Sequence, residues 1–173
     1  AYVYFVNGIM YALSGNNRTA IENFDEAIRL DPEFYRAYNN RGIAYADSEF
    51  YDLAISDYKM ALHFNIEDST IYNNLGVAYF KKKDYSQALI YLSQAIQLNP
   101  QYAEAYYNRS LVYRAMSNSL LANEDMGSAI AINPNYITHV ASVRNCEAQF
   151  GLTRETRYDD SDGDCIINDG TDA

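Results

Sequence analysis

The acidic residues near the C-terminal end of the chain have the spacing of a cation-binding loop. Asp160, Asp162 and Asp164 stand at alternate positions, and Asn168 follows at the ninth position of the same segment. A hard cation such as Ca²⁺ takes about six to eight oxygen ligands, which carboxylates, a backbone carbonyl and a side-chain amide supply around a tight loop. These residues therefore predict calcium binding. A plain acidic tail is the alternative, because residues 151–173 hold seven Asp or Glu and two Arg.

Two cysteines bear on the same segment. Cys146 lies in a helix predicted before the acidic residues, and Cys165 lies among them. In a reducing compartment they would be unrelated thiols, whereas in an oxidising one a disulfide would tie the tail to that helix. Closing a loop of this length typically stabilises a protein by about 3 kcal/mol. We expect the disulfide and a secreted or extracellular protein, with a cytoplasmic protein as the alternative.

Enzymatic chemistry has little support in the sequence. The two histidines, His63 and His139, lack a Ser, Cys or carboxylate constellation, and glycine-rich phosphate loops and zinc-ligand spacings are missing from the sequence. The net charge of −10 argues against broad contacts with nucleic acid or anionic membranes. No stretch approaches the ~18 apolar residues of a membrane span. We expect a protein that is not an enzyme and whose partner is a protein or peptide.

The elements that carry these residues follow a pattern with a period of 34 residues. Each copy has aromatic residues at positions 4 and 11, a small residue at position 8, alanines at 20 and 27, and a large residue at 24. In the first copy they are Tyr4, Tyr11, Gly8, Ala20, Ala27 and Phe24. Positions 4, 8 and 11 fall on one face of a first helix, and the alanines fall on one face of a second. We expect position 8 to be small because the facing helix approaches closely there.

This pattern is the signature of the tetratricopeptide repeat, and residues 1 to about 136 resemble that family. The resemblance implies an all-α, right-handed superhelical solenoid of antiparallel helix pairs, stabilised by the interfaces between repeats. Asp31, Asn65, Asn99 and Asn133 precede the Pro position and are expected to end each second helix. The expected units are repeats at 1–34, 35–68, 69–102 and 103–136, a capping helix at 137–151 and the acidic tail at 152–173.

The acidic segment has a resemblance of its own. It is similar to the calcium loops of dockerin modules and thrombospondin type 3 repeats, which also carry an apolar residue before the Asn. It departs from them at Cys165, where a glycine usually makes the sharp turn, and at Thr171, where a carboxylate usually closes the site. Both departures bear on the geometry of a bound cation.

The family resemblance places the binding groove on the first helices, at positions 2, 5, 6, 9, 12 and 13 of each repeat. Asn40, Asn74 and Asn108 recur at position 6 and form a ladder suited to a peptide backbone, because a carboxamide both donates and accepts hydrogen bonds. The position 5 residues beside them are Asn39, Asn73 and Tyr107. The alternative is that these asparagines are merely favoured residues of the repeat.

One activity of the family is not expected. Its cochaperone members grip a C-terminal carboxylate with Lys and Asn at positions 5 and 9 of one repeat and with Lys and Arg two repeats on. This chain has Phe5, Ile9, Thr70 and Asn74 at those places.

The N-terminal segment around Tyr2, Phe5 and Val6 is apolar on all sides, whereas the terminal repeat of a soluble solenoid normally has a polar outer face. A preceding region, a partner or another copy would have to cover it. The sharpest hypothesis is head-to-tail contact with Val140, Val143 and Phe150 of a second copy, which would propagate into a filament. The alternative is a peptide-binding adaptor domain that is a fragment of a larger protein.

Overall fold

The computed structural model describes residues 1–136, which form eight α-helices and one 3₁₀ helix. They are α1 (Tyr2–Leu13), α2 (Asn17–Leu30), α3 (Tyr35–Asp47), α4 (Tyr51–Phe64), α5 (Ser69–Lys81), α6 (Tyr85–Leu98), α7 (Ala103–Ala115), α8 (Ser119–Ile132) and η1 (Pro134–Tyr136). The all-α fold class is confirmed. The predicted capping helix, the calcium loop and both cysteines lie outside the described residues.

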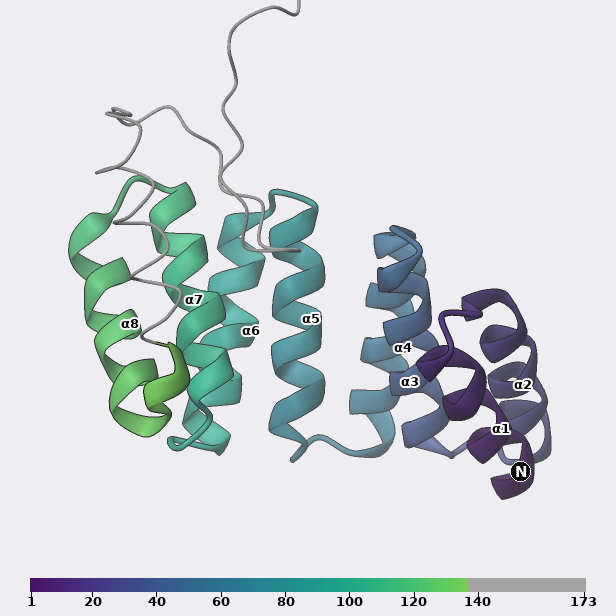
Figure 1. Ribbon diagram of the computed structural model, residues 1–173. Coiled ribbons are helices and arrows are strands. Elements are labelled where there is room, and N and C mark those ends of the chain that lie inside the picture. Colours follow the sequence, from purple (N-terminus) through teal and green to yellow (C-terminus); the bar gives the residue numbers. More distant parts are fainter. Residues whose placement is uncertain (137–173) are drawn as a thin grey trace, which may run out of the picture.

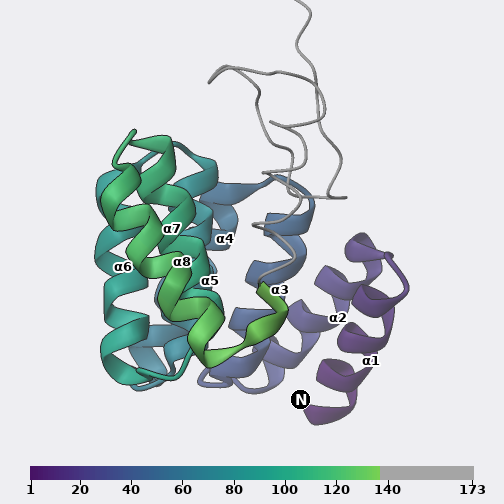
Figure 2. The same cartoon turned by 60° about the vertical axis from the view of Figure 1, so that its left-hand side comes forward.

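The helices stack as consecutive pairs. Each odd-numbered helix is the first helix of a repeat and packs against its own second helix. Helices α3, α5 and α7 also pack against the second helix of the preceding repeat. The stack begins with α1, which carries the N-terminus, and runs to α8 at the opposite end (Figure 1). A second view shows α1 at the edge of the array, with α2 and α3 beside it (Figure 2). No helix within residues 1–136 is both long and apolar enough to cross a membrane.

The asparagines and the aspartate before the Pro position end the second helices, as predicted. Asp31, Asn65, Asn99 and Asn133 are the C-cap residues of α2, α4, α6 and α8, and each has an extended backbone. The side-chain oxygen of each accepts a hydrogen bond of 3.1 to 3.3 Å from the backbone N–H two residues later. This local bond competes with continuation of the helix and turns the chain into the next repeat.

The small residue at position 8 allows the two helices of a pair to approach, which confirms the steric prediction. A Cβ on any of the three glycines there would clash with the large side chain at position 24 of the same repeat. The added atom would lie 2.5 Å from Phe24 at Gly8, 2.6 Å from Tyr58 at Gly42 and 2.6 Å from Leu92 at Gly76. In the fourth repeat, Ser110 occupies this position and is fully buried.

The core continues from one repeat into the next. Alanines at positions 20 and 27 are buried in every repeat, together with the large residue at position 24. One buried cluster joins α4 to α5 through Ile55, Ile71 and Ala78, and a second joins α2 to α3 through Ala37 and Ala44. Stability is therefore shared between repeats and does not belong to any single helix pair.

Candidate functional site

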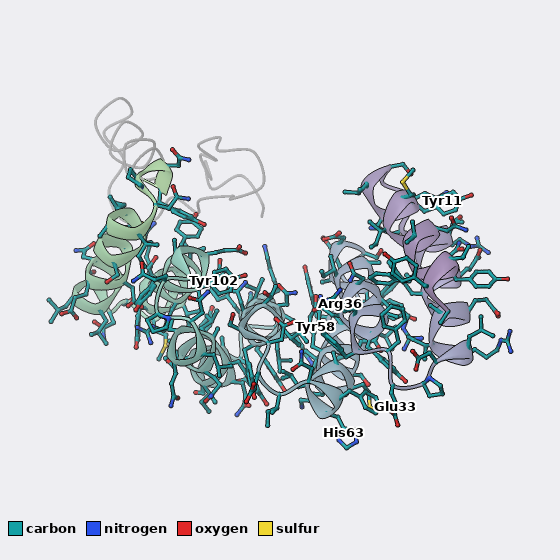
Figure 3. All side chains as sticks on the ribbon, turned by 90° about the horizontal axis from the view of Figure 1, so that it is seen from below. Tyr11, Glu33, Arg36, Tyr58, His63 and Tyr102 are labelled. Carbon is teal, nitrogen blue, oxygen red and sulfur yellow. The ribbon has the colours of Figure 1, made fainter. Side chains whose placement is uncertain are left out.

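The solenoid is curved, and the first helices lie on its inner side. Viewed along the helices, the pairs follow an arc, with Arg36 of α3 on the inner side and His63 of α4 on the outer side of the same repeat (Figure 3). Neighbouring first helices also contact one another directly. We define the inner face as the residues at positions 2, 5, 6, 9, 12 and 13 of the first helices.

The asparagines of the inner face are linked from repeat to repeat. The Nδ2 atom of Asn74 donates to Oδ1 of Asn39 over 3.1 Å, and Nδ2 of Asn108 donates to Oδ1 of Asn73 over 2.9 Å. The Nδ2 atom of Asn73 in turn donates to Oε1 of Glu104 over 3.2 Å. Position 6 of one repeat therefore bonds to position 5 of the repeat before it, which fixes the spacing of neighbouring first helices.

Two of these predicted groove residues differ in accessibility. Asn73 is only 1% exposed, so it connects helices and does not contact a peptide on the inner face, contrary to its predicted role. Asn40 is half-buried, and its Nδ2 donates to the Arg36 carbonyl of its own helix over 2.8 Å. A carboxamide has two donor hydrogens and two acceptor lone pairs. Asn40, Asn74 and Asn108 thus retain polar capacity beyond the bonds described.

Apolar and charged side chains complete the inner face. The position 9 residues Ile43, Val77 and Leu111 are half-buried. Arg36 and Glu104, at position 2 of their repeats, are exposed. Such a surface offers apolar contact together with fixed donors and acceptors, which suits an extended polypeptide. The Tyr107 ring packs against Tyr136 in a tilted arrangement, with ring centroids 5.0 Å apart.

Sequence reasoning missed a half-buried arginine that joins the first two repeats. Arg41 forms a bidentate pair with Asp57, through hydrogen bonds of 2.8 and 2.7 Å, and also pairs with Asp25 of the preceding repeat. The guanidinium carbon lies 5.6 and 6.0 Å from the ring centroids of Tyr38 and Tyr45. Burial lowers the pKa of Arg41, but the bonds to Asp57 and Asp25 outweigh burial and hold that pKa above its ordinary value.

The same arrangement recurs two repeats later. Arg109 pairs with Asp125 through bonds of 2.7 and 2.8 Å and donates to the Ser93 hydroxyl of the preceding repeat over 3.0 Å. It lies between Tyr106 and Tyr113, with ring centroids 5.8 and 5.9 Å away. We call each set an arginine clamp. The signal in the sequence was an Arg at position 7 with an Asp at position 23, present in the second and fourth repeats.

The predicted self-association residues fall into three groups. Phe5 is 7% exposed and packs within its own chain against Phe24 and Phe34, so it is not a surface contact as predicted. Tyr2 and Val6 are exposed, at 70% and 39%. Their expected partners at Val140, Val143 and Phe150 lie outside the described residues, and the head-to-tail contact stays a prediction.

Metal binding has no visible centre in the part of the chain that the structure describes. Among residues 1–136, no group of three or more His, Cys, Asp or Glu is close enough to hold a metal ion. Every buried side-chain nitrogen or oxygen in this part has a hydrogen-bond partner. The predicted calcium ligands Asp160, Asp162, Asp164 and Asn168 lie outside it.

Comparisons with known proteins agree with this architecture. A family model described as tetratricopeptide repeat matches residues 69–102, and a second, described as TPR repeat, matches residues 8–48. Comparison with the curated proteins gives no match.

Solved structures share the fold. The crystal structure of MamA is 28% identical, with a TM-score of 0.72 over 84% of this chain and 85% of that one. The Cut9–Hcn1 hetero-tetramer of the APC/C is 26% identical, with a TM-score of 0.71 over 76% of this chain and 27% of the matched one. The first TPR of Spaghetti (RPAP3), bound to the HSP90 peptide SRMEEVD, is 23% identical, with a TM-score of 0.65 over 67% and 92%. The two matched segments are tetratricopeptide repeats, and residues 1–136 fold as a tetratricopeptide-repeat solenoid.

Proposed function

We propose that this chain is a non-enzymatic scaffold that binds an extended segment of another protein along its inner face. The observation that carries the proposal is the row of carboxamides Asn40, Asn74 and Asn108, one on each of three successive first helices and all partly accessible. A peptide backbone lying across them would meet donors and acceptors at regular intervals. The half-buried apolar residues of position 9 lie beside this row.

The geometry of the inner face also favours a preformed site. The bonds from Asn74 to Asn39 and from Asn108 to Asn73 hold neighbouring first helices at fixed spacing before any ligand arrives. A site that is already ordered avoids part of the entropic cost of binding. The RPAP3 structure, which has the same fold, holds a peptide. We do not extend its ligand to this chain, because Phe5, Ile9 and Thr70 replace the residues expected to grip a C-terminal carboxylate.

The test begins with a peptide-display library selected against the 173-residue chain. Peptides that are enriched should bind more weakly to the Asn40→Ala variant in calorimetry. Loss of one or two ligand hydrogen bonds corresponds to roughly a tenfold rise in Kd. Asn40 is the best position for this test because its described bond stays within its own helix, so the change leaves the links between repeats intact.

His63→Ala is the matched control, since His63 is exposed on the outer side of the same repeat (Figure 3). Its peptide affinity should equal that of the unchanged chain. Failure to enrich any peptide, or equal binding by both variants, would refute the proposed site.

The acidic tail carries a separate proposal that rests on its sequence alone. Asp160, Asp162 and Asp164 would ligate Ca²⁺, and a disulfide between Cys146 and Cys165 would be formed in a secreted protein. Calcium should then raise the midpoint of thermal unfolding, because a ligand of the native state stabilises it. The variant with all three aspartates changed to Asn should show no such rise. Equal behaviour of the two proteins at millimolar calcium would leave only an acidic tail, and mass spectrometry without reductant tests the disulfide.

A further inference from the structure

Each first helix presents a row of four residues on the inner face, at positions 2, 6, 9 and 13 of its repeat. These positions are four, three and four residues apart, so they follow one side of an α-helix. In α3 the row is Arg36, Asn40, Ile43 and Asp47. Arg36 and Asp47 are exposed, and the two residues between them are half-buried. The proposed peptide site therefore has a charged side chain at each end of its α3 row.

The two charges of α3 oppose the dipole of their own helix. The N-terminus of a helix favours acidic side chains and the C-terminus favours basic ones, because backbone N–H and C=O groups are left unpaired there. In α3, Arg36 lies in the first turn and Asp47 is the last residue. Among the eight α-helices of residues 1–136, α3 alone has a basic residue in its first turn and an acidic residue in its last turn. This order is unfavourable for the fold, and a broken local rule is typical of a functional site.

Ion pairs within the described residues do not compensate these charges. The salt bridges of residues 1–136 include neither Arg36 nor Asp47. Arg36 donates a hydrogen bond of 3.1 Å to the Tyr35 hydroxyl, and its guanidinium carbon lies 5.7 Å from the centroid of that ring. The carboxylate of Asp68 acts on Arg36 from beyond ion-pair distance. Both charged side chains can therefore form an ion pair with a ligand on the inner face.

Helix α7 has the opposite order of charges. Glu104 lies in its first turn and Arg114 in its last turn, which is the order that the helix dipole favours. Helix α5 likewise has Lys81 in its last turn. All three residues are exposed. The order found in α3 is therefore a property of one repeat and is not required by the architecture of the first helices.

We infer that the ligand of the inner face is an extended peptide in which an acidic and a neighbouring basic side chain pair with Arg36 and Asp47. Successive side chains of an extended chain point in opposite directions. A peptide that crosses α3 at Asn40 thus directs one side chain toward each end of the helix. At ~1.5 Å per residue, Asn40 lies about 6 Å along the axis from Arg36 and about 10 Å from Asp47. A short acidic side chain and a long basic one match these two distances.

The charges also fix which repeat receives this part of the peptide. In the same chain direction over α7, the acidic side chain would point toward Glu104 and the basic one toward Arg114. Opposing like charges makes that register unfavourable. The acidic and basic pair therefore belongs over α3.

The inference rests on the proposed function, and its first test uses the peptides that display selection enriches against the 173-residue chain. Calorimetry compares the unchanged chain with the exchange variant Arg36→Glu, Asp47→Arg, which keeps the net charge. The exchange should weaken binding by about tenfold, because two favourable contacts become unfavourable. The variant should unfold at the same or a higher temperature, because α3 then has the charge order that its dipole favours.

A second peptide, with its acidic and basic residues exchanged, provides the rescue. It should bind the exchange variant about tenfold more tightly than it binds the unchanged chain. Damage to the fold could not produce such a recovery. The matched control is Arg18→Glu, Glu22→Arg, which reverses an exposed ion pair on α2. This control should bind both peptides as the unchanged chain does.

The possible outcomes separate this inference from the proposed function. Enriched peptides might lack the acidic and basic pair, or bind the exchange variant as tightly as the unchanged chain, while Asn40→Ala still weakens them. Either result would overturn the inference and leave the peptide site standing. Weaker binding without rescue by the exchanged peptide would overturn it as well, because the loss would then come from the fold. Failure to enrich any peptide would refute both proposals.

Discussion

Repeats two and four differ from repeat three at two positions where the paired helices face each other, although the first helices of all three have the same length. Repeats two and four carry Arg at position 7 and Asp at position 23, whereas repeat three carries Leu75 and Tyr91. Leu75 is fully buried, and the Tyr91 ring stacks on Tyr79, with ring centroids 5.4 Å apart and an angle of 8° between the ring planes. Helices α3, α5 and α7 nevertheless each have 13 residues. The solenoid accepts an ion pair or an apolar pair at this place.

The residue at position 25 of the preceding repeat explains why a repeat has an Arg–Asp pair or a Leu–Tyr pair at positions 7 and 23. Asp25 and Ser93 stand there before repeats two and four and accept hydrogen bonds from Arg41 and Arg109. Before repeat three the residue is Lys59, whose Nζ lies 5.6 Å from the Tyr79 ring centroid. An arginine in place of Leu75 would lie near the positive charge of Lys59. An arginine clamp therefore occurs only where position 25 of the preceding repeat can accept a hydrogen bond from the arginine. The clamp is weak evidence for added stability, because burying charged groups removes their hydration.

The largest effect should come from breaking one clamp. Arg41→Leu leaves the carboxylate of Asp57, which is 5% exposed, without its bidentate partner. An uncompensated buried charge typically destabilises a protein by about 3–5 kcal/mol. Denaturant unfolding should show that loss.

The double variant Arg41→Leu, Asp57→Tyr is the matched control, because it installs the pair that repeat three already uses. Its free energy of unfolding should return to within about 1–2 kcal/mol of the unchanged chain, since replacing both partners by apolar residues is often neutral. A double variant as unstable as the single one would show that the ion pair itself holds the second repeat together.

The reverse exchange should have a smaller cost. Leu75→Arg, Tyr91→Asp removes the stacking of Tyr91 on Tyr79 and places an arginine near Lys59, so we expect a loss of about 2–3 kcal/mol. Adding Lys59→Asp should recover part of it, because position 25 would then resemble Asp25. If the triple variant unfolds at the same temperature as the double variant, the role assigned to position 25 is wrong.

Alkaline pH should weaken the junction between the third and fourth repeats, which contains Tyr102, more than the junction between the first and second repeats, which has Phe34 at the same position. Burial, followed by the charge of Glu104, raises the pKa of Tyr102 from 10.0 to about 12. The folded state therefore holds this proton more tightly than the unfolded state. The resulting stability is fully present below about pH 10 and is lost as the pH rises toward about 12.

Tyr102→Phe introduces the residue found at the same position of repeat one, Phe34, and should remove this part of the alkaline loss. The difference in unfolding free energy between pH 9 and pH 12 should shrink by about 1–2 kcal/mol. Parallel pH profiles for the two proteins would contradict the assignment.

The smallest effects should come from the turn inside each repeat. Position 15 has a left-handed backbone in all four repeats, with φ of 77° at Gly15, 62° at Glu49, 62° at Lys83 and 59° at Ser117. Side chains with a Cβ are strained in this conformation. Glu49→Gly should therefore stabilise the fold by about 0.5–1 kcal/mol, and Gly15→Ala should destabilise it similarly. Thermal unfolding of both variants checks the sign of each effect. Destabilisation by Glu49→Gly, or stabilisation by Gly15→Ala, would refute the argument.

Much of the fold followed from spacing alone, because the repeat pattern concerns close packing. Gly8 and Gly42 are small where the second helix approaches, and Asn65 ends a helix even though Ile66 replaces the proline after it. Accessibility was harder to predict. Asn73 has the same residue type as Asn39 yet is buried, because Glu104 and Asn108 of the next repeat lie on it.

The arginine clamps were missed for a related reason. The pattern describes the positions that every repeat shares, and the clamps occur in only two of the four. Their partners also come from two different repeats, as Arg41 shows with Asp57 and Asp25. Pairwise comparison of alternate repeats would have found them.

The central claim is that the inner face binds an extended peptide, and amide chemical-shift mapping with a display-selected peptide tests it most directly. The account predicts that the largest shifts fall on α3, α5 and α7, around Asn40, Asn74 and Asn108. Helices α4 and α6, including His63, should change little. Shifts concentrated on the outer helices, or on the exposed Val3 and Met10 of α1, would contradict the claim.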